Sequence, residues 1–596
     1  MKRTIKFRAA ALGLAVVLAL GLGGCKHEPD PVAEQQRFDR YLEELVPVFA
    51  GTNSLTLNCL FNDPAAFGIT QTSAALPFAT EEAYQSEFQE IRGVLKDLKG
   101  FHAGQLDASS QLTLKILTDY LNRRLLLEPY YDLDNSYLGS FIGFQAQFPL
   151  LLNEYEFTNK QYFDDYFAML ESAGSVFAQY AEMEARRQKN GVGMSQTILQ
   201  KVIDQCASFS KEAPDFLIAA MAEKIKAVPF LTGAQKEEAL LKSERLLSDN
   251  LTDAYRALGE SLAGLLPAAS GSDLGLCSQP GGKKYYEALV KTKTGIDWSI
   301  DEIWDYLVDR SEDVVQSLQA RAIRNPAAAQ QYANGNFRYS DFKTAGETLD
   351  FLAERIKQDF PAIEKTPYTV SQVPDSMKDF FSPAAYFTQR VDAKPGAPER
   401  IVLNGEYKDT LFTTIAHEGY PGHLYQTVFF AGQNLPTVRY LIDYSGYSEG
   451  WANYVEHKSA AYAPADADAA VLAELGSQYI SCAIALSDIG IHYREWDRAD
   501  FSAFLTDALG IEDEDALNEQ YDMILETPAN YLQYYLNGLV FDELYQAAAK
   551  ELGSRFSAVA FHRVILQTGP ASLDILQEQI GQYVKAASES VPAIAA

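Results

Sequence analysis

The chain has 596 residues, of which 47% are hydrophobic, 12% aromatic and 22% charged. This composition is typical of a folded protein and excludes disordered, collagen-like and coiled-coil architectures, while the length predicts two or three packed units. With 80 acidic and 50 basic residues, the formal net charge is −30. This charge argues against a nucleic acid partner, because a phosphate backbone binds clustered Lys and Arg side chains. We interpret the acidity as a source of solubility.

The first 24 residues are typical of an export signal. Basic side chains precede an unbroken apolar or small-residue run over 9–22, which is too short to span a bilayer. The run ends in Leu22-Gly23-Gly24-Cys25, which resembles a bacterial lipobox; a signal without lipidation is the alternative. We expect a signal peptide over 1–24, a lipid anchor at Cys25 and a tether over 25–35. The mature protein is then an extracytoplasmic lipoprotein of the cell membrane.

Four cysteines follow the lipobox: Cys59, Cys206, Cys277 and Cys482. Cysteines of an exported protein can form disulfides, and we predict a bond between Cys206 and Cys277. Buried thiols without a disulfide are the alternative. The wide spacing excludes a zinc-ribbon site.

The chain is predicted to be mainly α-helical. From Phe38 onward apolar residues recur every three or four positions, as over 38–46, 112–121 and 162–187, which predicts amphipathic helices. Gly, Ser and Pro crowd together over 267–283, so we expect the chain to divide there. We place an N-terminal helical lobe at 36–270 and a second helical lobe, which carries the chemistry described below, at 281–596.

Two local signals refine this division. Ser299 and Glu302 form a capping box that begins the second series of helices. The segments 382–388 and 400–404 are β-prone and are separated by Lys394-Pro395-Gly396. They predict a β-hairpin or small sheet.

The chemistry is concentrated in the last third of the chain. Two histidines, His417 and His423, flank Pro421. Six residues apart on a straight helix, their rings would lie about 120° apart. Pro421 cannot donate to the carbonyl of His417, so we expect a kink, tolerated by Gly422, that brings the two rings together. Two ordinary surface histidines are the alternative.

A second motif supplies carboxylates. Glu449 follows His423 by 26 residues, and Glu456 lies on the same face of the same predicted helix. Two imidazoles and one carboxylate can form a three-ligand zinc site that leaves a position open for water. Glu418, next to one ligand, is then the natural general base. Glu456 could orient a ligating histidine, although a solvated helix face is the alternative.

Both motifs, HExxPGH over 417–423 and EGWA over 449–452, resemble those of the bacterial domain-of-unknown-function 885 family. The resemblance begins at Phe38, includes 63–69 and 282–298 and extends to 570, so it covers most of the chain. Members of this family are mostly helical, are often lipoproteins, and look like Glu-zincin metallopeptidases near carboxypeptidase Taq and the neurolysin-like oligopeptidases.

The resemblance implies a two-lobed metallopeptidase-like fold with a peptide-binding cleft beside the small sheet. It implies one Zn²⁺ ion held by His417, His423 and Glu449, with Glu418 as the base. The sequence departs from the family at Leu424, where a second histidine often stands.

A peptidase also needs a hydrogen-bond donor for the oxyanion that forms during hydrolysis. His492 is one candidate, because Asp488 lies one helical turn before it and could fix its tautomer. Tyr534 and Tyr535 are the others, and buried aromatic packing is the alternative for both.

Four further residues or segments have predicted roles. The strand 400–404 is expected to bind an extended peptide by edge pairing, and Arg439 could contact a substrate carboxylate. We expect His457 and His562 to be structural.

Two other functions compete with a zinc-dependent peptide hydrolase. Residues 446–450 match the G-x-S-x-G pattern of a serine esterase, with Ser448 as nucleophile and His492 or His562 as base. That motif requires a preceding strand, which 438–444 could supply, and a βα alternation, which the rest of the chain lacks. The other alternative is a lipid-anchored binding protein with a vestigial or structural metal site, although such a site has no use for Glu418. We predict the peptide hydrolase and leave endo- or carboxypeptidase action open.

Overall fold

A computed structural model describes residues 30–211, 215–269, 273–364, 366–373, 378 and 382–589. The predicted signal peptide, Cys25 and the tether as far as residue 29 lie outside the described residues. The fold is mainly α-helical with one small sheet, which confirms the predicted class.

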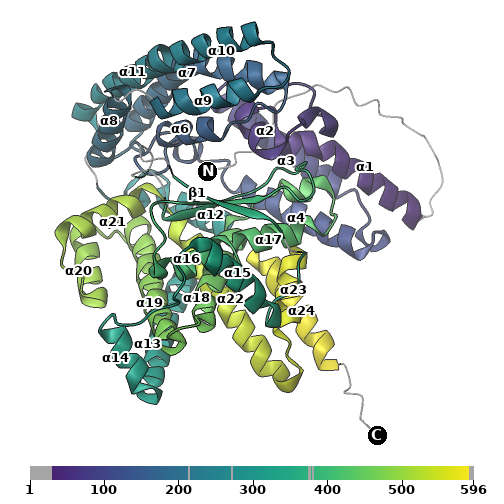
Figure 1. Cartoon of the computed structure of the whole chain (residues 1–596), viewed down its shortest axis with the longest axis vertical. Coiled ribbons are helices and arrows are strands. Elements are labelled where there is room, and N and C mark those ends of the chain that lie inside the picture. Colours follow the sequence, from purple (N-terminus) through teal and green to yellow (C-terminus); the bar gives the residue numbers. More distant parts are fainter. Residues whose placement is uncertain are drawn as a thin grey trace.

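The helices of the first half are α1 (Pro31–Ala50), α2 (Ser54–Leu60), α3 (Glu81–Leu98), α4 (Ala108–Leu125), α5 (Tyr131–Asp134), α6 (Phe144–Glu154), α7 (Lys160–Lys189), α8 (Gln196–Lys211), α9 (Asp215–Ala227), α10 (Gly233–Arg245) and α11 (Thr252–Ala263). The long helix predicted over 162–187 is α7. In Figure 1, α6 to α11 form the upper part of the molecule.

The helices of the second half are α12 (Gly282–Thr294), α13 (Ile300–Arg324), α14 (Pro326–Ala333), α15 (Ala345–Arg355), α16 (Phe412–Glu418), α17 (His423–Ala431), α18 (Ser445–Ser459), α19 (Ala467–His492), α20 (Arg498–Leu509), α21 (Glu514–Glu526), α22 (Asn530–Leu552), α23 (Ala558–Thr568) and α24 (Leu573–Glu589). The predicted capping box begins α13, where Ser299 and Glu302 exchange hydrogen bonds. In Figure 1, α13 to α24 form the lower part.

A single apolar core connects the two halves. One cluster of buried side chains runs from Phe38 in α1 to Val584 in α24. The chain passes from α11 to α12 through the Gly- and Pro-rich segment singled out above. Whether 36–270 and 281–596 behave as separate lobes stays a prediction.

The sheet has three strands in the order β1-β3-β2, with β1 at Tyr368–Gln372, β2 at Ala384–Phe387 and β3 at Glu399–Leu403. The predicted hairpin is the antiparallel pair β2–β3, and β1 adds a parallel strand on the other side of β3. Because β3 is paired on both sides, it has no free edge. The expectation that 400–404 pairs with a peptide is therefore wrong, and β2 is the edge strand on that side.

The predicted disulfide is also wrong. Cys206 is buried on α8, and Cys277 donates to the carbonyl of Ile491 at 3.2 Å instead of bonding to Cys206. Burial raises the pKa of the Cys206 thiol to about 12. Cys206 is thus an apolar packing residue.

Helix α19 is long and apolar enough to cross a membrane by length and composition. Of the apolar 18-residue stretch of α19 that meets this criterion, 56% is buried inside the protein. This burial is typical of a core helix of a globular protein.

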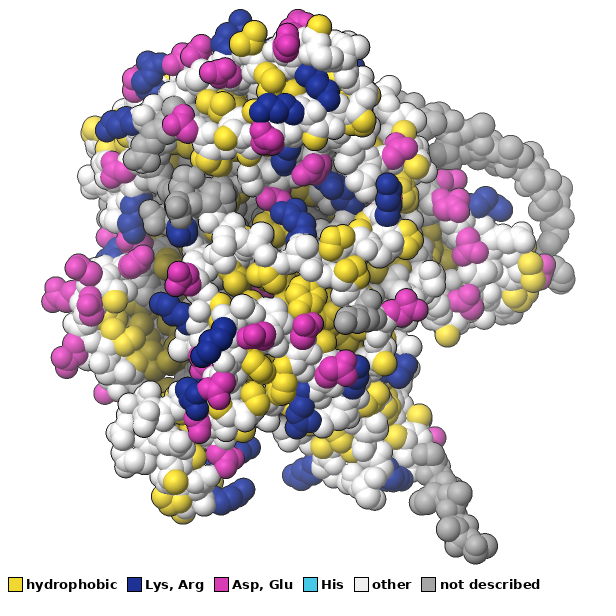
Figure 2. Space-filling model, viewed as in Figure 1, with side chains coloured by type: hydrophobic (Ala, Val, Ile, Leu, Met, Phe, Trp, Pro, Cys, Tyr) yellow, Lys and Arg dark blue, Asp and Glu magenta, His cyan; other side chains and the backbone are white. Residues whose placement is uncertain are grey.

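Charged side chains of both signs are mixed over the face shown in Figure 2. Acidic side chains gather at its left, over the region of α20 and α21, where Glu512, Asp513, Glu514 and Asp515 are all exposed. This distribution agrees with the interpretation of the acidity as a property of the solvated surface.

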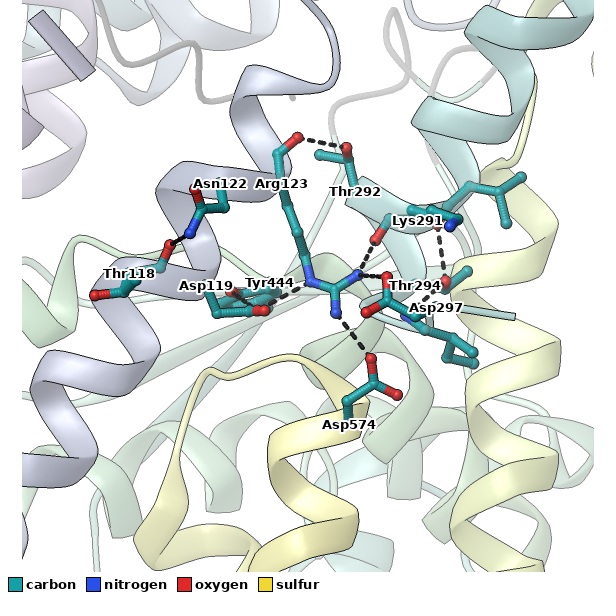
Figure 3. A network of polar contacts seen from close by, with 12 residues as sticks. Thr118, Asp119, Asn122, Arg123, Lys291, Thr292, Thr294, Asp297, Tyr444 and Asp574 are labelled. Carbon is teal, nitrogen blue, oxygen red and sulfur yellow. Dashed lines mark hydrogen bonds and ion pairs between the residues drawn. The ribbon is translucent and has the colours of Figure 1, made fainter. Parts of the chain in front are cut away.

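Arg123 on α4 joins helices that are far apart in the sequence (Figure 3). Its guanidinium bonds Asp119 at 2.9 Å, Asp297 at 3.2 Å and Asp574, on α24, at 2.9 Å. It also donates to the carbonyl of Lys291 in the last turn of α12. The side chain is only 6% exposed, so this network fixes α4 against α12 and α24.

We expect Arg123→Met to destabilise the protein by about 3 kcal/mol, because three carboxylates would lose the buried cation between them. The measurement is the midpoint of urea unfolding. Arg256→Met is the matched control, because Arg256 pairs with Asp253 at an exposed position and such pairs contribute little. Equal shifts in the two variants would contradict the importance of this network.

Candidate metal centre

The two histidines of the first motif lie on different helices. Helix α16 ends at Glu418 and α17 begins at His423, so Pro421 lies in a turn between two helices and not in one kinked helix. The two imidazole centroids are 4.9 Å apart and their planes cross at 81°. The expected approach of the rings is present, although a complete helix break produces it.

Gly422 makes this turn possible. Its N–H donates to the carbonyl of Ala416 at 3.0 Å, and a Cβ at this position would lie 1.7 Å from the carbonyl oxygen of His417. No side chain can occupy that space. Only glycine therefore allows the main chain to fold back closely enough to place His423 beside His417.

Glu449 reaches the two rings from α18. Its Oε2 lies 3.3 Å from Nε2 of His423 and 3.8 Å from Nε2 of His417. One ligand atom from each of the three residues lies within 4.8 Å of the others. The side chains of His417, His423 and Glu449 are 13%, 17% and 23% exposed, so the cluster is mostly enclosed but open to solvent. The structure thus brings the three predicted ligands together.

Two neighbours of Glu449 in the EGWA motif hold α18 in place. Trp451 is fully buried and its Nε1 donates to the carbonyl of Pro421 at 2.9 Å. A Cβ at Gly450 would lie 2.4 Å from Cβ of Asn537 on α22, so the glycine allows the two helices to pack closely. Sequence reasoning assigned no role to Gly450 or Trp451.

Glu456 lies about two helical turns further along α18, on the same face, and contacts the other side of His417. Its Oε2 is 2.9 Å from Nδ1 of His417. Since a carboxylate can only accept, Nδ1 donates and Nε2 is left to face Glu449. This is the orienting contact that the sequence predicted. Burial opposes ionisation of both groups, but their hydrogen bond prevails. The pKa of His417 is raised to about 9 and the pKa of Glu456 is lowered.

Glu418 is buried beside the cluster and is held by the sheet. Its Oε2 accepts a hydrogen bond from the backbone N–H of Tyr386 in β2 at 2.7 Å. Burial raises the pKa of Glu418, and the nearby charges of His417 and His423 oppose that rise. A carboxylate with a raised pKa is suited to accept a proton near neutral pH.

Tyr534 on α22 is the predicted oxyanion donor that faces this cluster. Burial raises its pKa well above the ordinary value, and the charges of Glu449 and Glu418 add to the rise, so the hydroxyl stays protonated. Tyr535 instead stacks on Tyr531, with ring centroids 5.8 Å apart, and belongs to an aromatic cluster.

Residues 64–580 match the family described as "Bacterial protein of unknown function (DUF885)". The chain belongs to this family. No curated protein matches its sequence.

Two solved structures have a similar fold. A predicted lipoprotein from Colwellia psychrerythraea has a TM-score of 0.74 and 19% identity, covering 93% of this chain and 98% of that chain. A predicted lipoprotein of unknown function from Shewanella oneidensis has a TM-score of 0.60 and 12% identity, covering 92% of this chain and 99% of that chain. At these identities the similarity establishes the fold alone.

The prediction for His492 does not hold in this DUF885 protein. Its Nδ1 accepts from the N–H of Leu276 at 3.2 Å, and its Nε2 donates to the carbonyl of Ile524 at 2.9 Å. With both nitrogens bound to the main chain, the ring has no donor for an oxyanion. Burial lowers the pKa of His492 to about 4, so it is a neutral structural residue.

Asp488 does not orient His492 either. It accepts hydrogen bonds from the hydroxyl of Tyr286 and the N–H of Ala529, which directly precedes α22. Burial raises the pKa of Asp488 to about 6, although both hydrogen bonds oppose the rise. The carboxylate therefore supports the start of the helix that carries Tyr534.

Arg439 cannot contact a substrate. It is buried at 1% exposure and donates to Thr113 and to the carbonyl of Thr568. Burial lowers its pKa to about 10. This arginine connects η9 (Thr437–Tyr440) with α4 and α23.

The two other histidines have the expected structural roles. Nδ1 of His457 bonds Glu474 at 2.9 Å. His562 is fully buried between the hydroxyl of Tyr454 and the carbonyl of Asp359.

The serine esterase alternative is excluded by the local structure. Ser448 lies inside α18 and its hydroxyl donates to the carbonyls of Tyr444 and Ser445. A nucleophile elbow needs a strand that turns into a helix, whereas η9 and a short loop precede α18.

We expect Gly422→Ala to weaken zinc binding about 10- to 100-fold, the loss typical when the support of a metal ligand is disturbed. The added methyl group would displace the carbonyl of His417 and separate the two rings. Gly432→Ala is the control, because its added Cβ would meet Phe429 at an ordinary 3.5 Å. Affinities are measured by competition with a zinc-binding dye, and equal affinities would contradict this role of Gly422.

Asp488→Asn tests the raised pKa of that carboxyl. Because the pKa is about 6 in the folded protein against an ordinary 3.8, the folded state binds more protons between these values. Wild-type stability therefore falls as pH rises through this window. The variant should gain about 3 kcal/mol of relative stability between pH 4 and pH 7, measured by urea unfolding. Asp507→Asn, which removes a carboxylate at an exposed position on α20, is the control. A flat difference for Asp488→Asn would show that its pKa is ordinary.

Proposed function

We propose that this protein is a zinc-dependent peptide hydrolase. The observation that supports the proposal most is the convergence of His417, His423 and Glu449, with the carboxylate of Glu418 enclosed beside them. A purely structural metal site would need only the ligands.

The donor set fits zinc. Two imidazole nitrogens and one carboxylate oxygen, open to solvent on one side, are the ligands of many catalytic zinc sites. Zinc held there would supply Lewis acidity, which polarises a peptide carbonyl and acidifies water.

The chain's own residues would perform the proton transfers. Glu418 would accept a proton from the attacking water and deliver it to the leaving amine. The hydroxyl of Tyr534 would donate a hydrogen bond to the developing oxyanion. Glu456 would keep Nε2 of His417 directed at the metal.

An extended peptide is the substrate that this surface would accept. β2 is the edge strand of the sheet and lies directly against Glu418. A peptide that lies along β2 would bring its backbone carbonyl toward the base and the metal. β2 thereby takes the role that the sequence assigned to 400–404.

We further propose that a lipid on Cys25 attaches the protein to a membrane outside the cytoplasm. The lipobox-like sequence supports this location, and two proteins of similar fold are predicted lipoproteins.

The decisive variant is Glu418→Gln, assayed against a library of short peptides. We expect zinc affinity to stay unchanged while cleavage falls at least about 100-fold, because the amide cannot accept the proton. Glu406→Gln removes a charge at an exposed position of the chain and should cleave like wild type.

Removal of the metal provides an independent check. A chelator should abolish cleavage and added Zn²⁺ should restore it. Equal cleavage by wild type and Glu418→Gln would remove Glu418 as the base. Zinc and peptide binding without any cleavage by wild type would instead indicate a binding protein.

A further inference from the structure

The loop between β2 and β3 is bound to the N-terminal half of the chain. The carboxylate of Asp392 accepts from the N–H of Asn62 at 2.6 Å and from the N–H of Asp63 at 2.8 Å. Next to it, Arg390 donates to the carbonyl of Asn58 at 2.5 Å, and the N–H of Val391 donates to the carbonyl of Leu60 at 2.8 Å. The loop is thus held to this segment at three consecutive residues, Arg390, Val391 and Asp392.

The segment that binds the tip is itself firmly fixed. The side-chain amide of Asn58 exchanges two hydrogen bonds with the main chain of Glu156. The carbonyl of Asn62 accepts from Thr158 and Asn159 at the start of α7. Asp63 begins the stretch 63–69, which carries part of the family resemblance but contributes nothing to the metal centre. Through the contact of Asp63 with Asp392, this segment helps to hold the β2–β3 loop in place.

Strand β2 of the same hairpin holds Glu418. The backbone N–H of Tyr386 points away from β3 and donates to Oε2 of Glu418 at 2.7 Å. The side chain of Tyr386 is anchored in turn, because its hydroxyl donates to Glu399 in β3 at 2.6 Å. Only six residues separate Tyr386 from Asp392. A displacement of the tip therefore reaches the donor that holds Glu418.

The metal ligands do not depend on this hairpin in the same way. His417 and His423 are positioned by the turn at Gly422, and Glu449 is positioned by α18. Trp451 ties these two parts together through the carbonyl of Pro421. The hairpin can shift without opening the ligand cluster.

We infer that Asp392 is a positioning residue for Glu418, acting through the β2–β3 hairpin. The inference rests on the proposed function, in which Glu418 is the base. The N-terminal half thereby contributes to catalysis without touching the metal: its segment 58–63 sets the place of β2, and β2 sets the place of the carboxylate. Loss of Asp392 lets β2 move, and the base leaves its productive orientation while the ligands stay together.

The test is a double-mutant cycle with full-length protein. Asp392→Ala should lower kcat about 10- to 100-fold, the cost typical of a displaced catalytic group, with zinc affinity and KM unchanged. In the Glu418→Gln background the same change should alter the residual kcat by less than about 2-fold, because the group that Asp392 positions is already lost. Asp392→Asn, which keeps one acceptor oxygen, should recover part of the loss. Lys394→Ala is the control, because Lys394 is exposed in the same loop.

Equal losses of kcat in the wild-type and Glu418→Gln backgrounds would overturn the inference, since Asp392 would then act independently of Glu418. A loss of zinc affinity in Asp392→Ala would overturn it too, since the hairpin would then support the ligands.

Hydrogen exchange tests the coupling without any activity. The amide of Tyr386 should exchange about 10-fold faster in Asp392→Ala and in Glu418→Ala, but not in Lys394→Ala. If wild type cleaves no peptide, the proposed function fails and this exchange pattern still decides the coupling. Unchanged exchange in Asp392→Ala would overturn it.

Discussion

The candidate metal centre depends on the close contact between Gly422 and the main chain of His417. The chain must reverse within four residues so that two histidines from consecutive helices face one point. At 1.7 Å from a carbonyl oxygen, even a methyl group is excluded, so this constraint is steric. Electrostatic interactions then stabilise the side chains that this turn brings together. Each imidazole is paired with a carboxylate, and Glu418 adds a further acid that burial keeps easy to protonate.

The two motifs act as one unit, although 26 residues separate His423 from Glu449. Trp451 donates to the carbonyl of Pro421, so the helix that supplies the third ligand also holds the turn that supplies the first two. Gly450 allows α18 to approach α22 closely. This close packing places Tyr534 of α22 beside the cluster. Asp488 accepts a hydrogen bond from the N–H of Ala529, which directly precedes α22. Buried packing thus determines which polar groups meet at the site.

The sequence was sufficient for the parts of the site that are local. Three local features were predicted from short patterns and are present: the approach of the His417 and His423 rings around Pro421, the shared helix of Glu449 and Glu456, and the hairpin. The predicted kink is instead a complete break between two helices. Contacts set by tertiary packing could not be predicted. Asp488 and His492 are one helical turn apart, but their hydrogen bonds go elsewhere. The imidazole bonds the main chain of Leu276, before α12, and of Ile524 in α21. The carboxylate accepts from Tyr286 and Ala529. Arg439 fails for the same reason, because its partners come from α4 and α23. No signal in the sequence identifies the N–H of Tyr386 as the partner of Glu418, since a backbone donor has no residue type.

The β2–β3 hairpin connects the N-terminal half of the chain to this site. A carboxylate held by a side chain of its own helix would need no contact with the first half of the chain, yet Glu418 is held by an edge strand whose loop is bound by 58–63. Edge strands are adaptable because one side of their backbone is unpaired, and β2 uses that side for the carboxylate. The position of the Tyr386 N–H therefore depends on the position of β2. β2 has four residues and one paired neighbour, and Asp392 fixes the loop that follows it. The long helical scaffold and the small His/Glu cluster are therefore connected through a few main-chain hydrogen bonds.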